Sequence, residues 1–133
     1  MAEEQIRRGA RYWVDDDGII RGREVFSETF ELSDAIEALA LIQKLAEGRK
    51  RCLLMDITKL KAMAREARAF FTRPAHTEVL HAVALQIGSP FSRAIGNIFL
   101  GLNRPAVPTR LFTEEEPALA WLRTFLRTGD APA

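Results

Sequence analysis

The sequence predicts a single α/β domain with a mainly parallel sheet of about five strands covered by about four helices. Three observations lead to this fold class: an early Asp-Gly hairpin signal, two nearly continuous apolar runs, and a helical pattern after each run. A chain of 133 residues can bury the core of one domain, 1–133, and we expect that core to span about residues 10–127. We expect residues 1–9 and 128–133 to be flexible.

Composition excludes several classes of protein. Hydrophobic residues make up 47% and charged residues 28% of the chain, which is typical of a globular protein and not of a disordered one. No apolar stretch approaches the roughly 18 residues of a membrane span. The formal charge of +1 provides no global field for nucleic acid, so we expect no nucleic-acid partner.

Cysteine content and the N-terminus indicate a cytoplasmic location. Cys52 is the only cysteine, so no disulfide can form within the chain. The first residues are acidic and lack the apolar segment of a secretory signal.

The first elements form an antiparallel pair. Strands are expected at residues 11–14 and 19–26, joined by the Asp-Gly turn at 15–18. Gly22 lies inside the second strand and indicates a β-bulge there.

A helix follows over about residues 33–47. Its apolar residues recur every three or four positions. Ser33 or Asp34 can cap its start, and Gly48 can adopt the left-handed conformation that ends it.

Two buried parallel strands come next, at residues 52–57 and 82–87. The first precedes a helical stripe from Leu60 to Phe71, and the second precedes one from Phe91 to Leu102. Ser89 suits the N-cap of that second helix.

The chain ends in a strand at 109–112 and a helix that buries Leu119, Leu122, Phe125 and Leu126. Thr113 and Glu116 have the spacing of a capping box at the start of this helix.

This β-β-α-β-α-β-α-β-α order resembles the STAS domain, the SpoIIAA-like fold of anti-sigma factor antagonists. The chain is more similar still to an uncharacterised bacterial family of STAS-like proteins. The segments that carry this similarity are Asp56-Ile57, Glu66-Ala67-Arg68, residues 89–97, Gly101-Leu102-Asn103 and residues 108–113. The resemblance implies a fold and assigns no reaction.

The loop after the first buried strand departs from the switching members of the fold. In the anti-sigma factor antagonists, a serine after the methionine of this loop is phosphorylated. Here Met63 is followed by Ala64, Arg65, Glu66 and Ala67, so arginine stands where the phosphate would go. Control by phosphorylation is therefore disfavoured. Arg65 and Glu66 instead form a candidate fixed charge pair for a partner, the alternative being a solvated helix face.

Open α/β sheets bind ligands beyond the carboxyl ends of their strands, where three loops are expected to converge. Their polar side chains form a candidate site for a small anionic or amphipathic ligand. The candidate residues are Asp56, Thr58, Lys61, Ser89, Ser92, Arg93 and Thr113. The alternative is structural: Ser89 and Thr113 serve as helix caps, and Asp56 tethers its own loop.

Signatures of catalysis and metal binding are weak. His76 and His81 would fall on different helical faces, and no G-x-S-x-G or HExxH motif is present. We therefore assign no catalytic residue, no metal and no cofactor.

The helix from Ser89 to Leu102 is apolar nearly all round, as expected of a helix that is deeply buried or shared with a partner. Phe99 and Leu100 are the residues expected at a homodimer interface, with core burial as the alternative. The leading functional hypothesis is a non-enzymatic regulatory or protein-interaction module. A ligand carrier or sensor is the second hypothesis.

Overall fold

The computed structural model describes residues 5–7, 10–24, 29–73, 79–88, 90, 92–94, 97 and 107–127. Its strands are β1 (Gln5–Arg7), β2 (Ala10–Val14), β3 (Ile20–Arg23), β4 (Thr29–Phe30), β5 (Arg51–Asp56), β6 (Ala62–Met63), β7 (Leu80–Gln86) and β8 (Thr109–Phe112). Its helices are α1 (Leu32–Ala46), α2 (Arg65–Phe70) and α4 (Glu115–Arg127), and residues 90, 92–94 and 97 are also helical.

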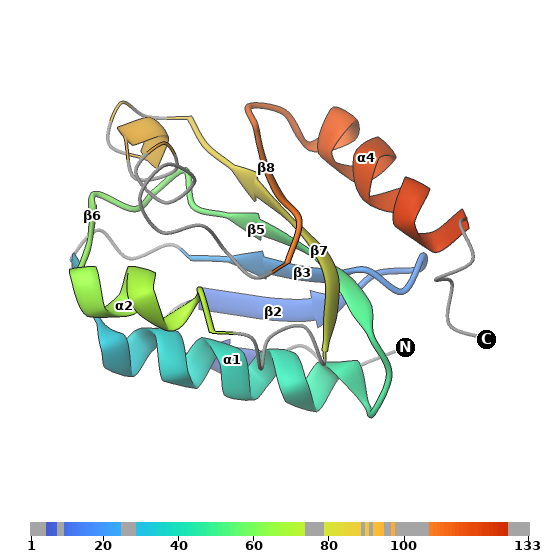
Figure 1. The fold of residues 1–133 in the computed structure, drawn as a ribbon, viewed down its shortest axis with the longest axis horizontal. Coiled ribbons are helices and arrows are strands. Elements are labelled where there is room, and N and C mark those ends of the chain that lie inside the picture. Colours follow the sequence, from blue (N-terminus) through green and yellow to red (C-terminus); the bar gives the residue numbers. More distant parts are fainter. Residues whose placement is uncertain are drawn as a thin grey trace.

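The main sheet has the order β1-β2-β3-β5-β7-β8 (Figure 1). The pairs β1–β2 and β2–β3 are antiparallel, whereas the pairs β3–β5, β5–β7 and β7–β8 are parallel. This confirms the predicted α/β class with a mainly parallel sheet. β1 pairs with β2 and extends the sheet into the N-terminal segment 1–9, where flexibility was expected.

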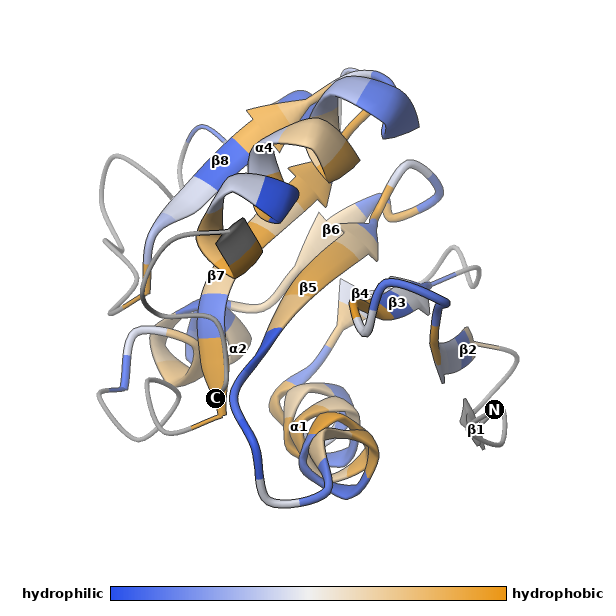
Figure 2. Cartoon of the chain, turned by 90° about the vertical axis from the view of Figure 1, so that its right-hand side faces the viewer, coloured by the Kyte–Doolittle hydropathy of each residue, from blue (hydrophilic) through white to orange (hydrophobic). Residues whose placement is uncertain are grey.

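Both faces of the sheet are covered, which explains the continuous apolar runs (Figure 2). Along β5, Leu53 and Met55 face a core shared with α1 and α2. Cys52 and Leu54 alternate with them and face a second core under α4. Because successive side chains of a strand point to opposite faces, a strand between two helical layers must be apolar at every position.

The ends of α1 are fixed by neighbouring residues. Asp34 Oδ2 accepts a hydrogen bond from Glu31 N at 2.8 Å, which anchors the first turn. Glu31, rather than Ser33 or Asp34, occupies the N-cap position. At the other end, Glu47 and Gly48 both adopt left-handed conformations, with φ of 54° and 80°.

The bulge predicted at Gly22 is wrong. The register between β2 and β3 is continuous, and Gly22 lies opposite Tyr12. A Cβ on Gly22 would lie 2.6 Å from Tyr12 Cε2 and 2.9 Å from Met55 Sδ. Glycine is therefore needed because the tyrosine ring lies against the strand backbone.

The helix expected from Leu60 to Phe71 is shorter than predicted. Leu60 lies in a turn and Met63 in β6, which pairs in parallel with β4 to form a small second sheet. Both residues still pack with Ala67 and Phe70 of α2 in the core beneath α1. The apolar residues that have helical spacing in the sequence therefore belong to three elements: a turn, a short strand and a short helix.

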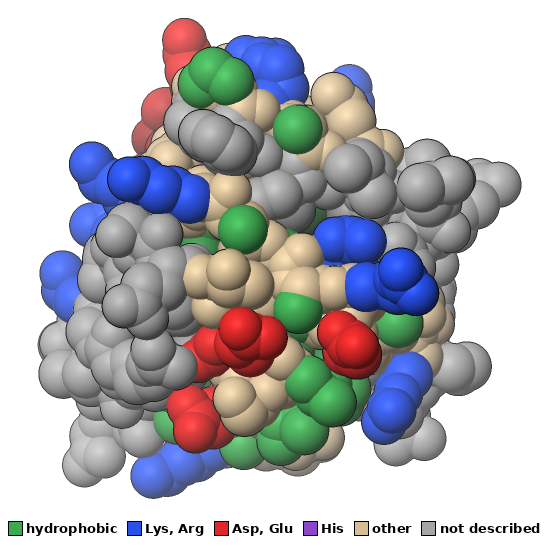
Figure 3. Space-filling model, turned by 90° about the vertical axis from the view of Figure 1, so that its left-hand side faces the viewer, with side chains coloured by type: hydrophobic (Ala, Val, Ile, Leu, Met, Phe, Trp, Pro, Cys, Tyr) green, Lys and Arg blue, Asp and Glu red, His purple; other side chains and the backbone are tan. Residues whose placement is uncertain are grey.

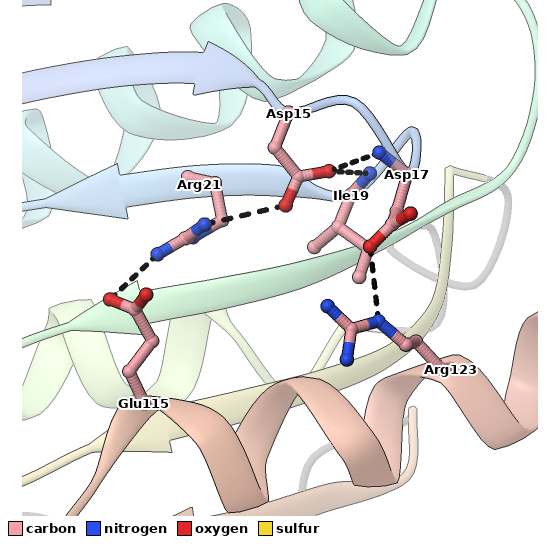
Figure 4. Close-up of polar contacts among 6 residues, drawn as sticks. All are labelled: Asp15, Asp17, Ile19, Arg21, Glu115 and Arg123. Atoms are coloured by element: carbon pink, nitrogen blue, oxygen red, sulfur yellow. Dashed lines mark hydrogen bonds and ion pairs between the residues drawn. The ribbon is translucent and has the colours of Figure 1, made fainter.

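Polar contacts join the β2–β3 hairpin to α4 (Figure 4). Asp15 Oδ1 accepts hydrogen bonds from the amides of Asp17 and Ile19, at 2.9 and 3.0 Å. Arg21 contacts Asp15 at 3.3 Å and Glu115 at 2.8 Å. Asp17 forms an ion pair with Arg123 at 3.0 Å. The Asp17–Arg123 pair is exposed on both sides, and an exposed pair contributes about 0–1 kcal/mol. The apolar contacts of α4 therefore provide most of its attachment.

Candidate functional site

Asp56 ends β5 at the edge of the sheet where the candidate loops begin. Its Oδ1 accepts hydrogen bonds from the amide and the hydroxyl of Thr58, at 2.9 and 2.7 Å. Its Oδ2 lies 3.4 Å from Nε of Arg23. The carboxylate therefore holds the turn that follows β5 and links it to the end of β3.

Backbone hydrogen bonds fix the rest of this loop. Leu60 is buried, and its amide donates to the carbonyl of Ile57 at 3.0 Å. The amide of Ala64 donates to the carbonyl of Phe30 at 2.9 Å, just before α2 begins. Arg68 Nη1 donates to the carbonyl of Met63 at 2.8 Å. The path from β5 to α2 is therefore anchored at both ends and in the middle.

Four charged side chains project from this anchored path. Lys59, Lys61, Arg65 and Glu66 are exposed. Figure 3 shows this end of the molecule, where acidic and basic side chains lie close together on the surface. Among the described contacts these four side chains make no ion pair, so Arg65 and Glu66 do not bond to each other as a pair. We call Lys59, Lys61, Arg65 and Glu66 the α2 loop surface.

The helical residues after β7 place the buried hydroxyl of Ser92 next to the exposed cation of Arg93. Ser92 is fully buried, and its Oγ accepts a hydrogen bond from the amide of Gly88 at 2.9 Å. Arg93 is exposed beside it. Ser89, Phe99 and Leu100 lie outside the described residues, as does the proposed dimer contact.

An open cleft of about 410 Å³ lies at the carboxyl ends of β7 and β8. Arg93 and Thr113 both line it, so the structure brings together two of the predicted ligand-binding residues. The other lining residues are Ile87, Asn97, Leu111, Phe112, Glu114 and Pro117. Asp56, Thr58, Lys61 and Ser92 are not part of its lining. Thr113 precedes the first residue of α4 by two positions, and its side chain is exposed.

The sequence reasoning missed a buried acid, Glu24. This residue directly follows β3 and is 1% exposed. Its Oε2 accepts a hydrogen bond from the hydroxyl of Tyr12, which also lies 3.6 Å from Met55 Sδ. A signal was present: the alternation of β3 places Glu24 on the inward face with Ile20 and Gly22.

A second missed feature is a cluster of arginines around Trp13. The guanidinium carbons of Arg11, Arg21 and Arg23 lie 5.4, 5.6 and 5.9 Å from the centre of a Trp13 ring. The sequence contained a signal for this cluster. β2 carries the pattern Arg-x-Trp and β3 carries Arg-x-Arg, and residues two apart share one face of a strand. Ion pairs to acidic residues already offset the charges of Arg21 and Arg23.

Cys52 has the features of a structural thiol. It is fully buried, and its Sγ lies 3.6 Å from the carbonyl oxygen of Leu122. Burial raises the pKa of the Cys52 thiol from 9.0 to about 12. The neutral thiol is therefore the form that the folded core contains.

We expect a thiol reagent at about pH 8 to label Cys52 only after unfolding. Because the folded pKa is above the unfolded one, the stabilisation from this group is complete below pH 9.0 and is lost as pH rises toward about 12. Urea unfolding of the wild type and Cys52→Ala across this range tests the prediction. The unfolding free energy of the wild type relative to Cys52→Ala should fall as the pH approaches about 12. A difference between the two proteins that does not change with pH would contradict the raised pKa of Cys52.

The described residues contain neither a cluster suited to a metal ion nor a membrane-spanning helix. No three His, Cys, Asp or Glu side chains in the described ranges are grouped so as to hold a metal ion. Within the same part of the chain, no helix combines the length and the apolar character needed to cross a membrane.

The fold is similar to that of an uncharacterised protein of the DUF3478 family from Shewanella loihica PV-4, whose crystal structure has a SpoIIAA-like fold. The two share 16% sequence identity with a TM-score of 0.58, and 92% of each chain is covered. This likeness shows the SpoIIAA-like fold alone.

A protein of unknown function from Arthrobacter sp. FB24 is 31% identical, over 85% of this chain and 92% of that one, with a TM-score of 0.31. No curated protein sequence matches the chain. The family described as Domain of unknown function (DUF7793) matches residues 12–126. The chain therefore belongs to the DUF7793 family and has a SpoIIAA-like fold.

Proposed function

We propose that the protein is a non-enzymatic interaction module that binds a protein partner through the α2 loop surface. One observation carries this proposal: residues 57–68 have a backbone that is fixed by hydrogen bonds but charged side chains that are exposed to solvent. The backbone is held by hydrogen bonds to Phe30, Gln86 and its own turn. The charged side chains of the surface are exposed and take no part in the ion pairs found among the described residues.

Such a surface is suited to recognition because its shape is set before binding. A pre-organised backbone loses little conformational entropy in a complex, so charge complementarity can contribute fully to specificity and association rate. Three basic residues against one acidic residue favour an acidic patch on the partner. Arg65 occupies the position of the phosphoacceptor in the switching relatives that the sequence resembles, so we propose that recognition here is constitutive.

Affinity capture with charge-reversed variants tests this proposal. The full chain would be immobilised and exposed to a lysate of cells that express it, and bound proteins would be quantified by mass spectrometry. We expect Lys59→Glu/Arg65→Glu to lower recovery of a specific partner by about tenfold or more, because rim charges control association. Its unfolding free energy should change by less than about 0.5 kcal/mol, because both side chains are exposed.

A matched control is Arg49→Glu/Lys50→Glu. These exposed residues lie in the turn between α1 and β5, at the opposite end of the molecule from the start of α2 (Figure 1). The control changes net charge by the same amount and should retain the partner. Equal loss in both variants would indicate non-specific electrostatics, and no loss in either would reject the α2 loop surface.

We propose small-anion binding as a second function, supported by the cleft that joins Arg93 to Thr113. An exposed guanidinium beside a hydroxyl suits a phosphate or carboxylate group. Inorganic phosphate at millimolar concentration should then raise the melting temperature of the wild type. Arg93→Ala should abolish that shift and Arg49→Ala should preserve it. A shift that is the same in all three proteins would be a general salt effect and would reject the site.

A further inference from the structure

A cavity of about 70 Å³ lies between the sheet and the layer formed by α1 and α2, apart from both surfaces discussed above. Its lining comes from the sheet, from α1, from the loop after β5 and from the end of α2. Glu24 is the only ionisable residue among the described residues of that lining. The remaining wall is almost entirely apolar and includes Ile42, Leu53, Leu60, Phe71 and Val83.

The position of Glu24 sets the chemistry of this cavity. Its carboxyl group is buried, and the bond from the Tyr12 hydroxyl to Oε2 fixes its orientation. A carboxylate has about four lone-pair sites, so it can accept a donor from a ligand in addition to the contacts that it already makes. Within the described lining, Thr109 is the other polar residue, and its hydroxyl donates to the carbonyl of Val107 at 2.9 Å.

Volume limits the size of the occupant. A cavity needs about 10–15 Å³ to hold one water-sized probe, so 70 Å³ corresponds to about five to seven such positions. Apolar walls disfavour a cluster of water, because each buried water requires about three polar partners. The space therefore suits a short hydrocarbon group with one polar end.

We propose that this cavity binds a small aliphatic amine, whose ammonium group bonds to Glu24 and whose hydrocarbon part packs against Leu53 and Val83. Charge-assisted hydrogen bonds to a buried carboxylate are stronger than neutral ones, and they select a cation over an acid or an alcohol of the same shape. Leu39 of α1 and Phe71 at the end of α2 are partly exposed members of the lining.

Isobutylamine, isobutanol and isobutyrate are suitable probes because they share one hydrocarbon skeleton. Each would be titrated into the 15N-labelled full chain near pH 7, where an alkyl amine with a pKa of about 10 is protonated. We expect saturable shifts of the Leu53 and Val83 amides with isobutylamine, binding at least about tenfold weaker for isobutanol, and none for isobutyrate.

Two variants test the site. Glu24→Gln keeps an acceptor for Tyr12 and removes the charge, and it should weaken amine binding about tenfold or more. Val83→Ile adds one methylene to the cavity wall and should also weaken binding, while the fold is retained. If Glu24→Gln does not fold, Val83→Ile decides the test.

Three results would overturn the proposal: no saturable shift in the folded wild type, equal amine affinity in Val83→Ile, or perturbed amides confined to exposed acidic residues. None of these results bears on the α2 loop surface, which lies outside the cavity lining.

Discussion

Gly22→Ala is expected to lower the unfolding free energy by about 2–3 kcal/mol. The added Cβ would lie 2.6 Å from Tyr12 Cε2, well inside van der Waals contact. Tyr12 cannot move away easily, because its ring is fully buried and its hydroxyl is bonded to Glu24. In a strand without such a neighbour, alanine would be no worse than glycine, so the whole loss measures this close approach.

Urea denaturation followed by circular dichroism measures this effect, and Gly48→Ala is its control. Gly48 has a φ of 80°, and a Cβ there would meet no atom within 4 Å. Its replacement should cost about 1 kcal/mol from backbone strain alone. A cost at Gly22 no larger than that at Gly48 would contradict the packing of Tyr12 against β3.

Leu122→Ala is expected to cost about 3 kcal/mol, the second large effect. Leu122 is fully buried in the core that α4 shares with Cys52, Leu54 and Ala84. Truncation removes transfer free energy and leaves a cavity beneath the helix. The two ion pairs of α4 with the hairpin lie at the surface on the α4 side and are too weak to compensate.

Thr124→Ala is the matched control for this helix. Thr124 is exposed two positions away, and alanine has the higher helix propensity, so its stability should change by less than about 0.5 kcal/mol. Urea midpoints of the three proteins provide the comparison. Similar midpoints for Leu122→Ala and the wild type would show that α4 is not packed on the sheet as described.

Local signals predicted the main elements well. The Asp-Gly turn has φ of 82° at Gly18, as the hairpin signal required. The apolar runs became β5 and β7, because strands between two helical layers contact apolar groups on both sides. Both inferences depend on residues close together in the chain.

Features set by distant parts of the chain could not be predicted in this way. The close approach at Gly22 depends on Tyr12 and Met55, which come from two other strands. The short pairing of β4 with β6 converts part of an expected helix into a strand, and its partner lies more than thirty positions earlier. The cavity beside Glu24 likewise depends on how α1, α2 and the sheet fit together.

In the candidate site too, the features set by nearby residues could be predicted and those set by distant parts of the chain could not. The sequence placed Asp56 at the end of a strand, and the structural alternative of a loop tether matches its bonds to Thr58. It identified Arg65 and Glu66 as charges at the start of α2, but it could not show that their side chains point into solvent without pairing. Arg93 and Thr113 meet in one cleft because β7 and β8 are neighbours in the sheet.

Hydrogen–deuterium exchange of the full chain, with and without the captured partner, tests the central claim most directly. If the α2 loop surface binds that partner, protection should increase over residues 57–70 and remain unchanged in α1 and α4. Protection confined to α1, to α4 or to the β1–β3 face, with residues 57–70 unchanged, would contradict the account.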